Sequence, residues 1–245
     1  MPKQPTMRIV LTALVSAFIF ASCHYVMGEQ ISGNGHITSR TENVGSFNSV
    51  DVGGAIEVHV KQDPTQSVKV ETDENLMQYL EVYTNGNTLI IHPRNGFNLD
   101  PSREIVVYVS APSYKSIEVS GASKIIGDNA ISGNNELSLN ASGASKIMME
   151  VNGGSIVSEV SGASTASFKG QAAKIDLQAS GASHINAYNL VADDVVVDAS
   201  GASSMEVTAN KTLKAEASGA SSVHYKGNAP VNGNASGGSS INKEG

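Results

Sequence analysis

Apolar and polar residues alternate along most of the chain beyond residue 36, and in the C-terminal half the alternation recurs at a regular interval. The residues one, three and five positions before each copy of a Ser-Gly-Ala-Ser motif are mostly apolar, as in Leu137, Leu139 and Ala141. The same parity continues after the motif, for example at Ile147. A period of two residues is that of a β-strand with one face turned inward. The pattern therefore predicts an all-β protein.

The motif itself sets the architecture. Ser-Gly-Ala-Ser occurs six times, Ser-Gly-Gly-Ser closes the series, and successive copies start 22, 19, 19, 20, 18 and 18 residues apart. Such a period predicts a β-solenoid whose coils pair in parallel register. About seven coils at roughly 4.8 Å each would make a rod of about 34 Å. The copies are Ser120–Ser123, Ser142–Ser145, Ser161–Ser164, Ser180–Ser183, Ser200–Ser203, Ser218–Ser221 and Ser236–Ser239.

Strict alternation through the motif places its glycine and its last serine on the inner side of each coil. A glycine there would allow a corner or a close backbone approach. Stacked serine hydroxyls could donate from one coil to the next. We therefore predict two structural ladders, one of Gly121, Gly143, Gly162, Gly181, Gly201 and Gly219, and one of Ser123, Ser145, Ser164, Ser183, Ser203 and Ser221.

A nucleophilic serine is the alternative role for the motif. It would need a base and an oxyanion site nearby, but no repeat supplies a histidine with an acid partner at a recurring position. His184 follows Ser183 directly, and alternation sends these two side chains to opposite faces. The pattern favours structural serines and predicts no catalytic residue.

Strands of irregular length are predicted between residues 36 and 112. Val50 to Val60 alternates with mostly polar neighbours, and Asn85-Gly86 between apolar runs predicts a hairpin. Residues 73–80 have the spacing of a turn or two of helix. We expect one solenoid domain over 36–245, with 36–112 beginning or capping the stack and 113–245 forming the repeats.

The N-terminus indicates export. A basic region with Lys3 and Arg8 precedes the uncharged run Ile9–Phe20, which is too short to span a bilayer. Small residues just before Cys23 resemble the lipobox of bacterial lipoproteins, although Phe20 stands where that family usually has Leu. The resemblance implies a signal peptide over 1–22, lipidation of Cys23, and a tether over 23–35. The alternative is an ordinary secretory signal with an incidental cysteine.

Charge and composition limit the classes of molecule that the protein is expected to bind. Without Lys3 and Arg8 the chain has 14 basic and 23 acidic side chains, a net charge of about −9. Nucleic acid is therefore not expected as a partner, because phosphate binding needs a basic face. Trp is absent and aromatic residues are scarce, so stacking platforms for bases or sugars are poorly supplied. The six histidines show no metal-ligand spacing, and we predict neither a metal nor a cofactor.

Two exposed lysines are weak candidates for contacting an anion. Lys124 and Lys146 each follow a motif serine on adjacent coils, where they could meet a phosphate or an acidic glycan. The alternative is two flexible, solvated side chains. An outward row of acids and amides that includes Glu118, Glu159 and Asp198 could similarly hold a cation or simply face water.

Several segments together resemble a known family. Val44–Val58, Val68–Leu76, Val107–Pro112 and the motif Ser120–Ser123 are similar to the auto-transporter adhesin family with a head GIN domain. The resemblance implies a Gram-negative envelope protein with a right-handed, pectin-lyase-like parallel β-helix and a role in adhesion. It brings no established catalytic residues with it.

Two functions follow as hypotheses. The first is a non-enzymatic, lipid-anchored protein of the cell envelope, expected at the outer membrane and facing the periplasm or the cell surface. It would bind a glycan or protein surface ligand, or act as a scaffold. The second is a polysaccharide-acting enzyme of the pectin-lyase type. The absence of Arg from residues 113–245 counts against a lyase that must neutralise an acidic sugar.

Overall fold

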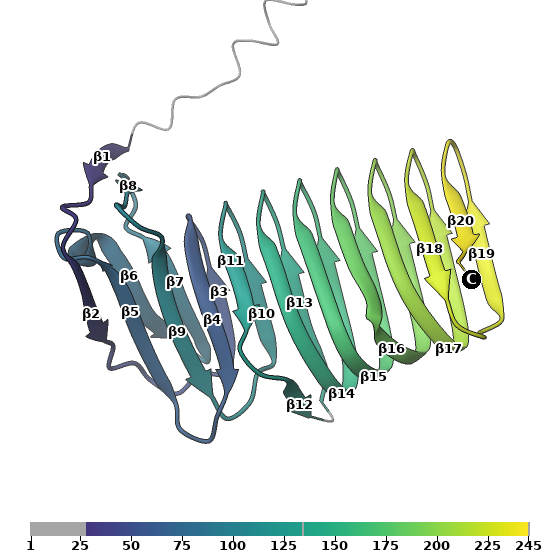
Figure 1. Ribbon diagram of the computed structural model, residues 1–245, viewed down its shortest axis with the longest axis horizontal. Helices are drawn as coiled ribbons and strands as arrows, with labels where there is room; N and C mark the ends of the chain where they lie inside the picture. Colours follow the sequence, from purple (N-terminus) through teal and green to yellow (C-terminus); the bar gives the residue numbers. More distant parts are fainter. Residues whose placement is uncertain (1–27, 134, 245) are drawn as a thin grey trace, which may run out of the picture.

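A computed structural model describes residues 28–133 and 135–244, and it confirms the predicted all-β solenoid (Figure 1). The right-handed sense and the count of seven coils stay predictions. The signal peptide, Cys23 and the first part of the predicted tether lie outside the described residues. Within residues 28–133 and 135–244, no helix has the length and apolar character needed to cross a membrane.

Each regular coil is one long, bent strand followed by a motif turn. The four such strands are β14 (Lys146–Val160), β15 (Thr165–Ala179), β16 (His184–Ala199) and β17 (Ser204–Ala217), paired in parallel along nearly their whole length. The motif turns form the row of pointed tips along one edge in Figure 1. The two halves of each strand give the solenoid two faces around one core.

We call these faces A and B. Face A contains β7, β3, β10, β13, the second halves of β14–β17, and β19. Face B contains β9, β4, β11, the first halves of β14–β17, β18 and β20. The bounds of the shorter strands of the repeat region are β10 (Ser116–Val119), β11 (Lys124–Gly127), β12 (Ile131–Gly133), β13 (Leu137–Ala141), β18 (Ser222–Lys226), β19 (Val231–Ala235) and β20 (Ser240–Lys243).

The core consists of aliphatic ladders that run through the stack. Parallel register places like residues above one another, as with Ile156, Ile175 and Val195 on face A. All three are at most 1% exposed. Each added coil buries further apolar area, and burial stabilises the folded state by about 25 cal/mol per Å² of apolar surface removed from water.

The motif glycines do not lie on the inner side of the coils, so the prediction of an inner glycine ladder is wrong. They are exposed at the tip of each turn, where the chain reverses direction and alternation is interrupted. Their φ values of +72° to +77° lie in the left-handed region that favours glycine. A Cβ on Gly181 would also lie 2.7 Å from the carbonyl oxygen of Gly162 in the preceding coil. Glycine is needed for backbone conformation and close stacking, and not for a narrow interior.

The same turns carry a ladder of backbone hydrogen bonds. The N–H of Ala182 donates to the carbonyl of Gly162 at 2.8 Å, and the N–H of Ala202 donates to that of Gly181 at 2.7 Å. Equivalent bonds join the motif turns of the other coils. Each exposed tip is therefore bonded to the tip before it.

The last serine of each of the six Ser-Gly-Ala-Ser copies is buried, with 1–2% of its surface exposed in Ser123, Ser145, Ser164, Ser183, Ser203 and Ser221. Ser239, in the closing Ser-Gly-Gly-Ser copy, is partly exposed. The serine hydroxyls bond mainly to backbone carbonyls. Ser183 Oγ donates to the carbonyl of Val160 at 2.9 Å, and Ser221 Oγ donates to that of Ala199 at 3.0 Å. A hydroxyl–hydroxyl contact joins Ser145 and Ser164 at 3.3 Å. The buried hydroxyls are thus satisfied by the coil beneath, largely without bonding to one another.

The N-terminal region stacks out of chain order. Strands β3 (Ser49–Val52) and β4 (Ile56–Gln62) form a coil that lies between two others. On one side are β7 (Thr88–Pro93) and β9 (Ile105–Ala111), and on the other are β10 and β11. The turn joining β3 to β4 matches a motif turn: Gly54 has φ +100°, and its carbonyl accepts from the N–H of Ala122 at 2.8 Å. The sequence search missed this turn because its residues are Gly-Gly-Ala-Ile.

Antiparallel strands cover the N-terminal end of the stack. β5 (Ser67–Asp73) pairs with β2 (Ile37–Thr41) and β9, and β6 (Leu80–Asn85) pairs with β7. The Asn85-Gly86 hairpin is confirmed, while the predicted helix is reduced to the 3-10 turn Met77–Tyr79. β1 (Glu29–Ser32) pairs with β8 (Phe97–Asp100), so this part of the predicted tether is a strand.

A buried carboxylate joins the segments of this N-terminal unit. Asp73 accepts hydrogen bonds from the N–H of Gly35 at 2.7 Å and from Ser102, whose hydroxyl lies at 2.7 Å and whose N–H lies at 2.9 Å. Burial alone would raise the pKa of Asp73, but the bonds from Ser102 and Gly35 outweigh it and hold the pKa below 3.8. The charged form therefore ties the chain before β2 to the loop before β9.

The motif turns give a direct test. Gly181→Val should destabilise the fold by about 2–4 kcal/mol, because valine is strained at positive φ and its Cβ would overlap the Gly162 carbonyl. Ala182→Ser, at the neighbouring exposed tip position, should change stability little. Urea denaturation followed by circular dichroism measures both. Equal midpoints for the two variants would contradict the role assigned to the turn.

Candidate functional site

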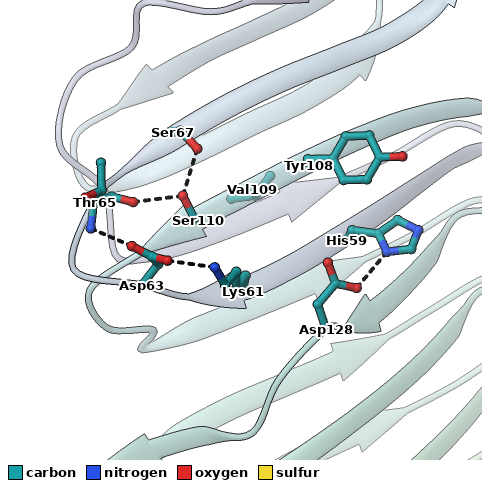
Figure 2. Close-up of a pocket in the computed structure, with 9 residues that line it drawn as sticks. All are labelled: His59, Lys61, Asp63, Thr65, Ser67, Tyr108, Val109, Ser110 and Asp128. Carbon is teal, nitrogen blue, oxygen red and sulfur yellow. Dashed lines mark hydrogen bonds and ion pairs between the residues drawn. The ribbon is translucent and has the colours of Figure 1, made fainter.

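A hollow of about 280 Å³ lies on the outer surface of face B (Figure 2). It forms where β4 and β9 pair and where the loop after β11 passes beside them. Strand alternation explains its lining: Val58 and Val60 are buried, so their neighbours in β4 point outward. The lining residues are His59, Lys61, Asp63, Thr65, Ser67, Tyr108, Val109, Ser110 and Asp128.

His59 is held by carboxylates on both ring nitrogens. Nδ1 lies 2.7 Å from Asp128 Oδ1, and Nε2 lies 3.0 Å from Glu57 Oε1. Burial opposes protonation of His59, but the hydrogen bonds to Asp128 and Glu57 outweigh burial and raise the pKa of the imidazole above its ordinary 6.5. Because both nitrogens are occupied, neither is free to act as a general base toward a substrate.

The network continues into the next coil. Lys124 Nζ lies 2.5 Å from Glu57 Oε2, and this contact holds the pKa of Glu57 below its ordinary 4.5. Residues 67 positions apart in the chain are thus joined in a row of alternating charge, Lys124–Glu57–His59–Asp128. The predicted anion-contact residue Lys124 is therefore compensated by a carboxylate. Lys146 lies beside it in register on β14 and is exposed.

An aromatic platform borders this network. Tyr108 is 39% exposed, and its ring centroid lies 5.2 Å from that of His59 with the ring planes tilted by 30°. Lys69 Nζ lies 5.7 Å from the Tyr108 ring centroid. Such a surface offers a π face together with neighbouring polar atoms.

Hydroxyls and a further ion pair complete the hollow. Ser110 Oγ donates to the carbonyl of Thr65 and shares a hydrogen bond with Ser67 Oγ, each at 2.8 Å. Lys61 Nζ lies 2.8 Å from Asp63 Oδ2. Figure 2 shows these contacts across the hollow from Tyr108 and His59. The arrangement can accept and donate hydrogen bonds, but its serines have no activating base among the residues drawn.

The site residues predicted from the sequence do not line the hollow on face B, although Lys124 lies close to it. The motif glycines and serines form the narrow edge of the solenoid, and Cys23 lies outside the described residues. Ser183 is buried and bonded to Val160, while the neighbouring His184 begins β16 and is partly exposed. Within residues 28–133 and 135–244, no cluster of three or more His, Cys, Asp or Glu side chains is arranged to hold a metal ion.

Sequence reasoning missed Tyr108, His59 and Asp128. Alternation in β4 and β9 does send His59 and Tyr108 outward, and that signal was available. What could not be seen was that β9 and β11 pair on either side of β4. Only this pairing brings side chains from 59, 108 and 128 into one hollow.

A parallel β-solenoid with polar and aromatic side chains gathered on an outer face defines a class of repeat domain that presents an extended surface. This chain belongs to the family described as "Putative auto-transporter adhesin, head GIN domain", whose model matches residues 46–229. No curated protein matches the chain.

Solved structures share the fold at low sequence identity. A "putative adhesin" from Bacteroides fragilis NCTC 9343 has a TM-score of 0.78 and 18% identity over 87% of this chain and all of that one. A "putative adhesin" from Parabacteroides distasonis ATCC 8503 has a TM-score of 0.73 and 21% identity over 88% of this chain and all of that one. A "putative lipid binding protein" from the same strain has a TM-score of 0.67 and 21% identity over 89% of this chain and all of that one.

The His59 network predicts a pH dependence of stability. Because the folded pKa of His59 is raised above 6.5, its stabilising contribution should be complete below about pH 6.5 and should fade as the pH rises through the folded value. The free energy of unfolding should therefore differ more between wild type and His59→Gln at pH 6 than at pH 9. Urea melts at the two pH values measure this difference. A gap that stays constant or widens at pH 9 would refute the proposed network.

Proposed function

We propose that the protein is a non-enzymatic, lipid-anchored component of the cell envelope that binds a surface ligand on the outer faces of its solenoid and acts in adhesion. The proposal rests on one observation, which is that the charged side chains in and beside the hollow on face B are already paired with one another. His59 is bonded on both ring nitrogens, and Lys61 and Lys124 are each paired with a carboxylate. Groups fixed in this way suit recognition, whereas a catalytic base or nucleophile must be free to react.

The family and the fold support the same conclusion. The adhesin description of the family suggests a protein of the cell envelope or surface. A solenoid stacked by backbone hydrogen bonds gives a stiff, extended surface. Because it is elongated, it exposes more surface than a compact domain with the same number of residues. The anchor at Cys23 would hold that surface at the outer membrane.

A polysaccharide-acting enzyme of the pectin-lyase type is the alternative, and such chemistry needs no activated serine. A serine-dependent enzyme is a separate possibility, and serine reactivity tests that one. A fluorophosphonate probe should leave the full chain unlabelled, because the last serine of each Ser-Gly-Ala-Ser copy is buried and none of these hydroxyls is bonded to a histidine or carboxylate among the described residues. Ser183→Ala should lower stability by about 1 kcal/mol through the lost bond to the Val160 carbonyl. Stoichiometric labelling of any motif serine, read by mass spectrometry, would support the hydrolase instead.

The anchor is tested separately. Cys23→Ala should release the protein from the membrane fraction, because several acyl chains on one residue hold a protein to a bilayer firmly. Cell fractionation and immunoblotting measure the shift. The matched control is Ser22→Ala, which keeps a small residue before the cysteine and should leave the protein in the membrane fraction. If Cys23→Ala stays there too, the lipoprotein hypothesis fails.

The adhesive role is tested on cells. A strain that lacks the protein should attach less to surfaces coated with an extracellular matrix mixture, and re-expression of the wild-type chain should restore attachment. Re-expressed Cys23→Ala should not restore it, because the released protein no longer links the cell to the surface. Equal attachment by all strains would contradict the proposal.

A further inference from the structure

A second hollow adjoins the first on face B. It measures about 330 Å³, and it is lined among others by Ile126 of β11, Met148 of β14 and Phe168 of β15. The register joins the two hollows, because Tyr108 lies beside His59, His59 beside Ile126, and Ile126 beside Met148. We call this row and its borders the outer groove. Four neighbouring strands at roughly 4.8 Å spacing give the row a length of about 14 Å along the solenoid axis.

The floor of the outer groove is open and mostly apolar, with the ion-paired imidazole of His59 among its apolar side chains. Tyr108 is 39% exposed, and Ile126 and Met148 are partly exposed on the outer surface. Phe168 beneath them is buried, at 2%. A row of one aromatic ring, one imidazole and two aliphatic side chains can pack against flat apolar surfaces presented from solution. An acyl chain lying there would keep much of its surface in water, so the floor suits a ligand that is apolar on one side only.

The borders of the outer groove are polar, and their lysines are paired with neighbouring carboxylates. Lys61 pairs with Asp63 at 2.8 Å, and Lys169 pairs with Glu150 at 3.0 Å. Towards the C-terminal end, Asn186 and Asn189 also line the groove, where a register shift between β15 and β16 interrupts regular pairing. Irregularities of this kind commonly re-aim side chains beside binding sites. The borders therefore offer hydrogen-bond donors and acceptors, and the two lysines that line the hollows, Lys61 and Lys169, are each paired with a carboxylate, which reduces their attraction for an anion.

We propose that the outer groove binds a neutral, linear glycan that lies along the solenoid axis, an inference that rests on the proposed adhesive function and names its ligand class. A pyranose ring has a face of C–H groups, which matches the Tyr108–Met148 floor, and an edge of hydroxyls, which matches the carboxylate and amide borders. A polymer of such rings repeats its contacts along one axis, as the coils do. An acidic glycan is disfavoured because the borders are neutralised and the chain has an excess of acidic residues.

The experiment is a binding measurement on the full chain, purified in detergent. The probes are immobilised cellohexaose, mannohexaose and xylohexaose, with hexagalacturonate as the acidic counterpart and phosphatidylcholine vesicles as the lipid counterpart. At least one neutral hexasaccharide should bind, and hexagalacturonate should bind more weakly. Acyl chains on Cys23 would bind vesicles by themselves, so the expected result for the lipid counterpart is vesicle binding that is the same for Tyr108→Ala and the wild-type chain. Tyr108→Ala and Met148→Ser should each weaken that binding at least tenfold. Tyr83→Ala is the matched control, because Tyr83 is a 49% exposed tyrosine on β6, outside the outer groove.

Several outcomes would overturn the inference. These are the absence of binding to all three neutral hexasaccharides, preferential binding to hexagalacturonate, vesicle binding that is lost in Tyr108→Ala, and equal losses of glycan binding in Tyr83→Ala and Tyr108→Ala. Thermal melts of each variant show whether a loss reflects unfolding, and Tyr108→Phe, which keeps the ring, should retain binding where Tyr108→Ala does not. If no hexasaccharide binds but cells still need the protein to attach, the adhesive function stands and the glycan assignment fails.

Discussion

The structure depends on the close stacking of one turn on another. Each motif glycine adopts a left-handed φ, which lets the next N–H donate to the glycine carbonyl of the preceding turn. A side chain at the glycine would collide with that carbonyl, so any other residue would push the coils apart. Parallel register along the rest of the coil follows from this spacing, and with it the aliphatic ladders and the bonds of the buried serines.

The outer groove is a product of that register. An outward side chain on one strand becomes part of a binding surface only through the strands on either side, because hydrogen-bonded neighbours bring their side chains within contact distance. His59 meets Tyr108 on one side and Ile126 on the other, although these residues are 49 and 67 positions away in the chain. The ion pairs from Lys124 to Glu57 and from His59 to Asp128 then fasten the N-terminal coils to the first repeat.

Much of the fold could be predicted from the sequence, and the reasons are local. Alternation at positions such as Leu137 and Leu139 and the period of the motif depend on residues close together in the chain, so they identify strands and stacking. The direction of the motif glycines could not be read from alternation, because a reversing turn interrupts the period of two. The candidate site was missed for a different reason. Its parts come from strands whose pairing partners lie far apart in sequence, and periodicity carries no information about which strand pairs with which.

The stacking order of the N-terminal coils bears on how the protein folds. The coil of β3 and β4 lies between strands that the chain supplies only later, at 88–111 and 116–127. It therefore cannot bury both of its edges until about residue 127 has been made, and the loops that it must close are long. The repeats that follow need only the coil before them. Folding should thus be slow and cooperative for the first half of the chain and stepwise for the second, with the finished N-terminal unit serving as the template on which each later coil is added.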